Sequence, residues 1–169
     1  MRIVYYPDPV LLKAAALVEE LPENLDEIVA GMREVMALER GIGLAAPQVG
    51  IGLQIILIGA TSDEEEERVL LNPRIARFAG KKEWGEEGCL SFPGIYGDVL
   101  RSTEIEVAYT DLEGHEQTLI ANDFFARVLQ HEIDHLKGQI FVNKMRPSDK
   151  IVNRARLQEL RDRFEAAKA

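Results

Sequence analysis

Cysteine, histidine and basic residues are all scarce in this chain of 169 residues. It contains one cysteine, Cys89, and three histidines, and its 20 Lys and Arg are outnumbered by 29 Asp and Glu, so the formal net charge is −9. A single cysteine excludes an internal disulfide framework and is typical of a reducing compartment. The acidic balance argues against a broad nucleic-acid or membrane surface, so we expect neither sequence-specific nucleic acid nor membrane among its partners.

Long apolar runs and targeting patterns are also missing. No segment approaches the ~20 consecutive apolar residues that cross a bilayer. Met1 leads directly into Arg2-Ile3-Val4, without the pattern of a signal peptide, and we therefore expect a cytoplasmic protein. The length predicts one domain over residues 1–169, which we expect to be a monomer, and its 46% hydrophobic content is enough for one core.

Hydrophobic spacing predicts a helix near the start of the chain and strands in its middle. Residues 24–40 carry apolar side chains at intervals of three and four, which is typical of an amphipathic helix. The β-branched run at 54–58 predicts a buried strand, and residues 69–71 predict another. Residues 104–119 alternate on both sides of an Asp-Leu-Glu-Gly turn and predict a hairpin. The acidic run at 63–67 is interpreted as a solvated loop.

Two further helices are predicted in the last third of the chain. Residues 123–137 are apolar on nearly every face, which indicates a buried helix, and Gly138 ends it. Pro147-Ser148-Asp149 predicts the cap of one last helix. Strands in the middle with helices early and late indicate an α+β fold. We expect mainly antiparallel strands packed around the buried helix, with a long N-terminal helix and a C-terminal helix.

The most specific motif is His131-Glu132-Ile133-Asp134-His135, in the predicted buried helix. Histidines four residues apart project from the same helix face, so both imidazoles can reach one metal ion. Glu132 lies beside that face, where a carboxylate can take a proton from a metal-bound water. The alternative is a pair of core histidines that bond to backbone carbonyls.

A catalytic metal site needs a third protein ligand and an open position for water. The candidates are Cys89, His115 and a carboxylate. Small residues precede Cys89 and would let the backbone approach a metal, although a lone cysteine is often only a buried apolar residue. His115 follows the predicted hairpin turn, and we expect it to be exposed to solvent.

A glycine-bearing segment at residues 41–48 formally matches the dinucleotide-binding pattern G-x-G-x-x-A. That pattern requires a strand before it and a helix after it. Here the end of a helix precedes it, and Pro47 blocks helix propagation. We interpret the segment instead as backbone that passes close to another group, with Gln48 presenting an amide donor.

Three segments together, residues 43–48, 87–91 and 130–135, resemble the signature motifs of peptide deformylases in their order and spacing. The resemblance covers essentially the whole chain. It implies removal of the formyl group from N-formylmethionyl peptides, the nascent products of bacterial and organellar ribosomes. By motif match, the metal ligands are Cys89, His131 and His135, the general base and acid is Glu132, and the oxyanion is bound by Gln48 and the backbone N–H of Leu90.

The resemblance also implies a cofactor and a substrate pocket. The cofactor is one divalent metal ion per chain, Fe²⁺ in the cell, with Zn²⁺, Ni²⁺ or Co²⁺ as substitutes. Residues expected to contact the substrate are Ile42, Gly43, Leu44, Glu87 and Val128. Val128 precedes His131 by three residues and therefore lies on the metal-facing stripe of the helix, although ordinary core packing is the alternative.

Two other functions share some of these residues. An H-E-x-x-H metalloprotease or related amidase would use the same helix and base, but it would need a third ligand other than Cys89 and would leave Gln48 without a role. A structural zinc domain would need four closed ligands, with His115 or a carboxylate as the fourth.

The last segment, residues 144–169, is basic in an acidic chain. Its eight basic residues, Lys144, Arg146, Lys150, Arg154, Arg156, Arg161, Arg163 and Lys168, stand against four acidic ones. This asymmetry favours local attraction to phosphate, and the resemblance implies weak ribosome contact through this C-terminal helix. The alternative is a solvated helix face whose Leu157, Leu160 and Phe164 pack on the domain.

Overall fold

The computed structural model describes residues 1–61 and 66–168. The helices are α1 (Leu25–Leu38), α2 (Asp123–Leu136), α3 (Pro147–Val152) and α4 (Arg154–Ala166), and short 3-10 helices occupy Pro9–Leu12, Ala46–Val49 and Phe141–Lys144. The strands are β1 (Gly43–Ala45), β2 (Ile55–Ile58), β3 (Arg68–Gly88), β4 (Tyr96–Thr110) and β5 (Glu116–Asn122). None of the described helices is both long and apolar enough to cross a membrane.

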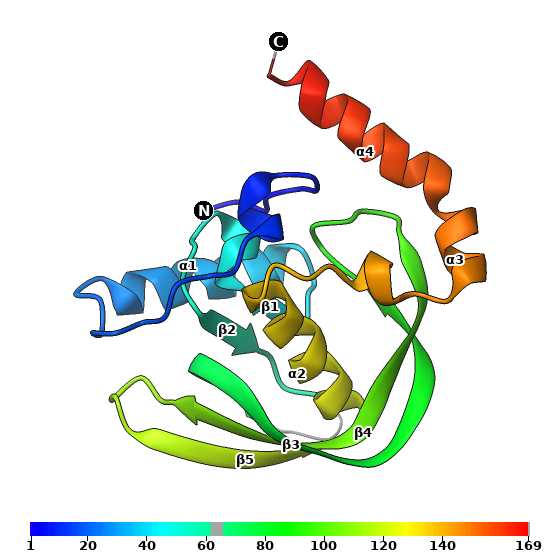
Figure 1. Cartoon of the computed structure of the whole chain (residues 1–169). Coiled ribbons are helices and arrows are strands. Elements are labelled where there is room, and N and C mark those ends of the chain that lie inside the picture. The colour runs from blue at the N-terminus through cyan, green and yellow to red at the C-terminus, as the bar shows by residue number, and fades with distance from the viewer. Residues whose placement is uncertain (62–65, 169) are drawn as a thin grey trace.

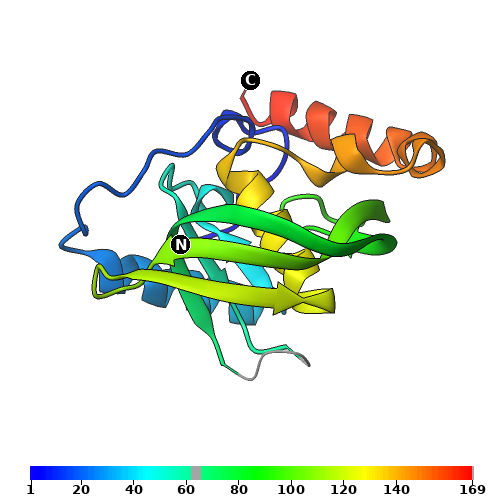
Figure 2. The ribbon, with the colours of Figure 1, turned by 60° about the horizontal axis from the view of Figure 1, so that its bottom comes forward.

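The five strands form one antiparallel sheet in chain order, β1-β2-β3-β4-β5. Helix α2 lies against one face of this sheet, and the long β3–β4 hairpin curves around it (Figures 1 and 2). Apolar residues of α2 and of the central strands form one buried cluster, which includes Ile56, Ile105 and Leu129. The structure therefore confirms an α+β fold with antiparallel strands around a buried helix.

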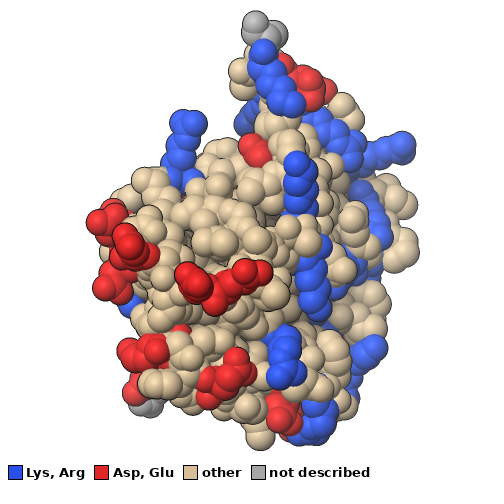
Figure 3. All heavy atoms as spheres, turned by 60° about the vertical axis from the view of Figure 1, so that its left-hand side comes forward, with Lys and Arg blue, Asp and Glu red and all other residues tan. Residues whose placement is uncertain are grey.

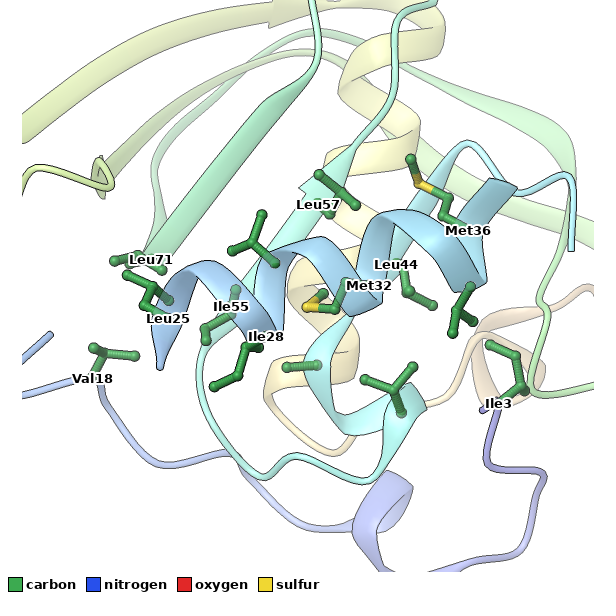
Figure 4. Packing of buried hydrophobic residues seen from close by; sticks show 14 residues of the cluster. Ile3, Val18, Leu25, Ile28, Met32, Met36, Leu44, Ile55, Leu57 and Leu71 are labelled. Carbon is green, nitrogen blue, oxygen red and sulfur yellow. The ribbon is translucent and has the colours of Figure 1, made fainter. Parts of the chain in front are cut away.

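Helix α1 covers β1 and β2 through a second apolar cluster (Figure 4). Met32 of α1, Leu44 of β1 and Leu57 of β2 are fully buried there. The amphipathic spacing predicted for residues 24–40 produces this packing, since the buried residues of α1 recur every three or four positions. A third cluster joins the N-terminal segment, the β3–β4 connection and α4.

Two sequence expectations about these elements differ in outcome. The strand predicted at 69–71 is confirmed, but it is only the start of the 21-residue β3, whose register shifts between Leu71 and Lys82 interrupt the regular pairing with β4. The single last helix is two helices, which meet at the buried Asn153. The solvated loop predicted at 63–67 lies mostly outside the described residues.

Candidate metal and substrate site

One turn of α2 brings two histidines together. His131 and His135 are both buried, and their Nε2 atoms lie 3.2 Å apart. Cys89 follows the end of β3, and its Sγ lies 3.2 Å from Nε2 of His135. The three ligand atoms all lie within 4.8 Å of one another. The predicted ligand trio therefore converges on one point, although its members are 42 and 46 residues apart along the chain.

The donor set and its spacing fit a metal ion. Two nitrogen ligands of a tetrahedral zinc ion, each about 2.0–2.1 Å from it, lie roughly 3.3 Å apart. Nδ1 of His131 lies 2.9 Å from Oε2 of Glu87. A carboxylate can only accept, so the imidazole donates from Nδ1 and turns the lone pair of Nε2 toward Cys89 and His135.

Glu87 is held by a buried network of charges. Arg101 donates to both of its oxygens, at 2.8 and 2.9 Å, and Arg127 donates at 3.0 Å. Burial acts to raise the pKa of Glu87, but the hydrogen bonds from Arg101 and His131 outweigh it and lower the pKa to about 2. We expected a substrate contact from Glu87. In the structure both oxygens accept hydrogen bonds from His131 and the arginines, and Glu87 also lines the neighbouring cavity, so its contact with the substrate stays a prediction.

The network continues away from the ligands. Arg101 also donates to Oδ2 of Asp134, at 2.6 Å, and Lys144 donates to Asp134 at 2.8 Å. These pairs connect β4, α2 and the 3-10 helix at Phe141–Lys144. Because buried charges are costly unless they are paired, the network constrains how these elements pack behind His131.

Glu132 is buried next to the ligands, and its Oε2 has no hydrogen-bond partner within the described chain. Burial raises the pKa of Glu132 to about 7, and the neighbouring His131 acts in the opposite direction. A Cβ at Gly43 would lie only 2.6 Å from Oε1 of Glu132. The interpretation of residues 41–48 as backbone passing close to another group is confirmed, and that group is the Glu132 carboxyl.

Gln48 presents its amide to the same point. Its Oε1 accepts from the backbone N–H of Ala45 at 2.8 Å, which fixes the amide orientation. Its Nε2 then lies 3.3 Å from Sγ of Cys89 and 3.4 Å from Oγ of Ser91. The side chain is 1% exposed, so the amide donor lies buried beside the ligand atoms.

The ligand group borders a cavity of about 550 Å³. Seven of the predicted site residues line it besides His131 and Glu132: Ile42, Gly43, Gln48, Glu87, Cys89, Leu90 and Val128. The mixture of apolar walls with a few convergent polar groups is typical of a binding site for a small organic group.

The family model for polypeptide deformylase matches residues 1–151. This chain belongs to the polypeptide deformylase family. The peptide deformylase of Endomicrobium trichonymphae is 44% identical over 143 residues, which cover 85% of this chain and 84% of that protein. The family identification confirms the resemblance seen in the three motifs.

Solved structures agree with this family. A crystal structure of peptide deformylase from Plasmodium falciparum superimposes with a TM-score of 0.93 at 39% identity and covers 99% of both chains. Arabidopsis thaliana peptide deformylase 1B, in complex with an inhibitor, gives a TM-score of 0.92 at 36% identity over 99% of this chain and 93% of that one. The chain is therefore an amide hydrolase that removes the N-terminal formyl group from nascent peptides.

Leu44, a predicted substrate contact, and His115, a candidate third ligand, both lie outside the cavity lining. Leu44 is fully buried in the cluster under α1 and is absent from the cavity lining, because alternate residues of β1 face opposite sides. His115 lies at the β4–β5 turn with 73% of its side chain exposed, as expected, and is no part of the ligand group.

Several residues of the cavity carry no sequence motif. Tyr5, Arg40, Tyr96, Phe124 and Arg127 also line it. They come from four separate segments, since Phe124 and Arg127 both lie on α2, and aromatic and basic residues are too common to identify a site. Only the fold brings them to one rim.

Proposed function

We propose that Cys89, His131 and His135 hold the catalytic metal of this deformylase and that Glu132 transfers the protons. The observation that carries the proposal is the convergence of three ligand atoms within 4.8 Å of one another, beside the unpartnered Oε2 of Glu132. When bound, a divalent ion polarises a carbonyl oxygen and makes a water far more acidic.

Glu132 then acts as base and acid in turn. Its buried carboxylate accepts the proton of the attacking water and later delivers that proton to the leaving amine nitrogen. The close approach of Gly43 holds the carboxyl against the ligand group, because no side chain separates this backbone from Glu132. A base so placed reaches both the water and the amine without a large movement.

Gln48 and the backbone N–H of Leu90 stabilise the developing oxyanion. The geometry of Gln48 supports this role, since its Oε1 is already engaged by Ala45 and only its N–H groups face the site. Leu90 directly follows the ligand Cys89 and lines the same cavity. Each such donor typically contributes about 3 kcal/mol to transition-state binding.

The formylmethionyl side chain occupies the cavity beside the ligands. Ile42, Gly43 and Val128 line it, and Val128 lies one turn before His131 on α2. An unbranched thioether side chain packs well against such mixed apolar walls.

Fe²⁺ is the ion that we propose for the cell, with Zn²⁺, Ni²⁺ or Co²⁺ as substitutes. A thiolate with two imidazoles suits both iron and zinc. Metal analysis after anaerobic purification, combined with turnover per bound ion, tests the proposal. Iron content that tracks turnover supports it, whereas undiminished turnover of a protein that contains only zinc contradicts it.

The two competing functions lose their support. A metalloprotease of the H-E-x-x-H type would place Cys89 away from the histidines, yet its Sγ lies 3.2 Å from Nε2 of His135. A structural zinc site would close with a fourth ligand, and within the described residues the group holds only three.

We also propose that the protein is a monomer and acts in the cytoplasm. There it makes a weak contact with the ribosome through the C-terminal helix. In Figure 3, Lys and Arg side chains lie at the top, together with a few acidic ones, and continue down the right side, while most acidic side chains gather lower on the left. Leu157 and Leu160 face inward and are buried, so the outer face carries the charge. Co-sedimentation with ribosomes should fall in high salt and after Arg154→Glu with Arg163→Glu. Ribosome binding that is unaffected by both high salt and the double substitution would contradict this contact.

Formate release tests the main proposal directly. The protein, purified with its metal protected, should release formate from a formyl-Met tripeptide, leave the matching acetyl-Met tripeptide intact, and lose turnover when a chelator removes the metal. Equal hydrolysis of internal peptide bonds would indicate a protease instead.

A further inference from the structure

The connection between β3 and β4 forms one wall of the cavity, and helices α3 and α4 lie next to it (Figure 1). Pro93 and Gly94 in this connection and Tyr96 at the start of β4 line the cavity. None of the three belongs to the ligand group or touches Glu132 through a hydrogen bond. Their positions depend on the contacts that the backbone of this connection makes on the side away from the cavity.

The first of these contacts is made by Asn153, where α3 meets α4. Its Nδ2 donates to the backbone oxygen of Tyr96 at 2.7 Å and to that of Asp149 at 2.9 Å. The residue is 5% exposed, so water does not readily replace the donor. A hydrogen bond made by a buried donor costs more to remove than one between two surface groups. Asn153 therefore anchors the backbone at which Tyr96 enters the cavity rim.

The second contact is made by Arg156, one turn further along α4. Its guanidinium donates to the backbone oxygen of Gly94. Gly94 has a φ of 73°, in the region that favours glycine, and a Cβ at this position would lie 3.4 Å from Nη1 of Arg156. The guanidinium of Arg156 therefore packs against the turn at Gly94 and also donates a hydrogen bond to it.

Apolar and aromatic contacts complete the attachment of α4. Leu157 and Leu160 are buried in one cluster with Phe92 and Ile95 of the connection. Arg161 donates to the hydroxyl of Tyr6 at 3.0 and 3.1 Å from its Nη2 and Nε. The Tyr6 ring stacks on Phe92 with centroids 4.9 Å apart. Helix α4 thus contacts the wall from its outer side along most of the connection.

We propose that Asn153 and Arg156 are positioning residues that hold the Pro93–Tyr96 wall in the shape that receives the peptide substrate. The inference rests on the proposed function, because it takes the cavity as the peptide site. Both residues bond to backbone oxygens of the wall and neither touches the metal ligands. Their loss therefore weakens peptide binding and leaves the chemical step unchanged. The C-terminal helices then serve substrate affinity, a role separate from any ribosome contact.

The test compares kcat and KM for a formyl-Met tripeptide in four variants of the full chain. Asn153→Ala should raise KM about tenfold and Arg156→Met about threefold to fivefold, with kcat within about twofold of the parent, because each removes one hydrogen bond to the wall. Arg156→Lys should restore KM to within about twofold, since an ammonium can still donate to Gly94. Glu159→Met, an exposed change on the same helix, is the matched control and should alter neither constant.

Two results would overturn the inference. One is an unchanged KM in both Asn153→Ala and Arg156→Met, even if the melting temperature falls, because that is the behaviour of contacts that only stabilise the fold. The other is a lowered kcat with unchanged KM. If Asn153→Ala does not fold, the pair Arg156→Met and Arg156→Lys, at an exposed position, decides alone. A parent protein that releases no formate contradicts the proposed function instead.

Discussion

The inner end of the cavity and its outer wall are built by different means. At the inner end, His131, Glu132 and Gln48 are all less than 10% exposed. The Glu87 carboxylate orients His131 at 2.9 Å, and the backbone N–H of Ala45 orients Gln48 at 2.8 Å. At the rim, Ile42 and Phe124 are 42% exposed and Tyr96 is 58% exposed. The backbone oxygen of Tyr96 accepts a hydrogen bond from Asn153, and the connection before Tyr96 packs on α4 through apolar side chains.

This contrast separates chemistry from binding. Removing one partner of a buried ion pair costs much free energy, because it leaves the other charge buried without compensation. Changes at the inner end are therefore expected to affect metal binding or the rate of the chemical step. Exposed residues contribute contact area that water partly replaces, so changes at the rim are expected to affect KM. The following variants test this division, from the largest expected effect to the smallest.

Glu132→Gln should have the largest effect on turnover. The amide keeps the shape of the side chain but cannot carry the proton, so kcat should fall by about 10⁴-fold. Metal content should stay near one ion per chain, because the three ligands remain. Turnover of formyl-Met tripeptide and metal analysis on the same sample check both parts, and near-normal turnover would refute the assigned role.

Cys89→Ser should mainly affect the metal. Loss of the thiolate should lower metal affinity by at least about 100-fold, since a hydroxyl is a poor ligand for these ions. Competition with a chromogenic chelator measures the affinity. His115→Ala removes a histidine outside the ligand group and should bind metal as the parent does. Equal affinity in both variants would make Cys89 a packing residue only.

Glu87→Gln tests the support behind the ligands. Removing the charge leaves Arg127 without its anion and Arg101 with Asp134 alone, and it weakens the orientation of His131. Metal affinity should fall about 10- to 100-fold, the usual range for a partner of a ligating histidine. Glu83→Gln, on the exposed part of the same strand, should leave the affinity unchanged. A substrate-contact role for Glu87 would instead raise KM at unchanged metal affinity.

Ile42→Ala should have the smallest effect. The side chain lines the cavity but remains 42% exposed, so it loses only part of its apolar area to the substrate. KM should rise about threefold with kcat unchanged, in line with about 25 cal/mol per Å² of apolar contact. A fall in kcat beyond about twofold would show that the rim also contributes to the chemical step.

The residues that sequence reasoning identified are those with a local pattern. His131 and His135 stand one turn apart, and the apolar spacing of α1 and α2 is regular over four turns, so motif and periodicity were sufficient. Cys89 was one of three candidate ligands and Gln48 a candidate donor, and the resemblance to the family assigned their roles, because a single cysteine or glutamine has no spacing of its own.

The parts that were missed depend on contacts between distant segments. Arg101 joins Glu87 and Asp134, which lie 14 and 33 residues away, and no local pattern marks such a residue. Leu44 was assigned to the pocket because its neighbours are there, yet the alternation of β1 turns it into the core. Asn153 interrupts the last helix to reach Tyr96, a contact that only the folded hairpin supplies.

The order of the strands has a consequence for how the protein matures. Because the sheet runs β1 to β5 in chain order, each strand can pair with the one before it as the chain leaves the ribosome. The histidine ligands come after all five strands, and Asn153 and Arg156 come later still. A chain still under synthesis can therefore hold a nearly complete sheet and yet have neither a metal site nor a finished peptide wall. The chain therefore becomes catalytically competent only near the end of its own synthesis.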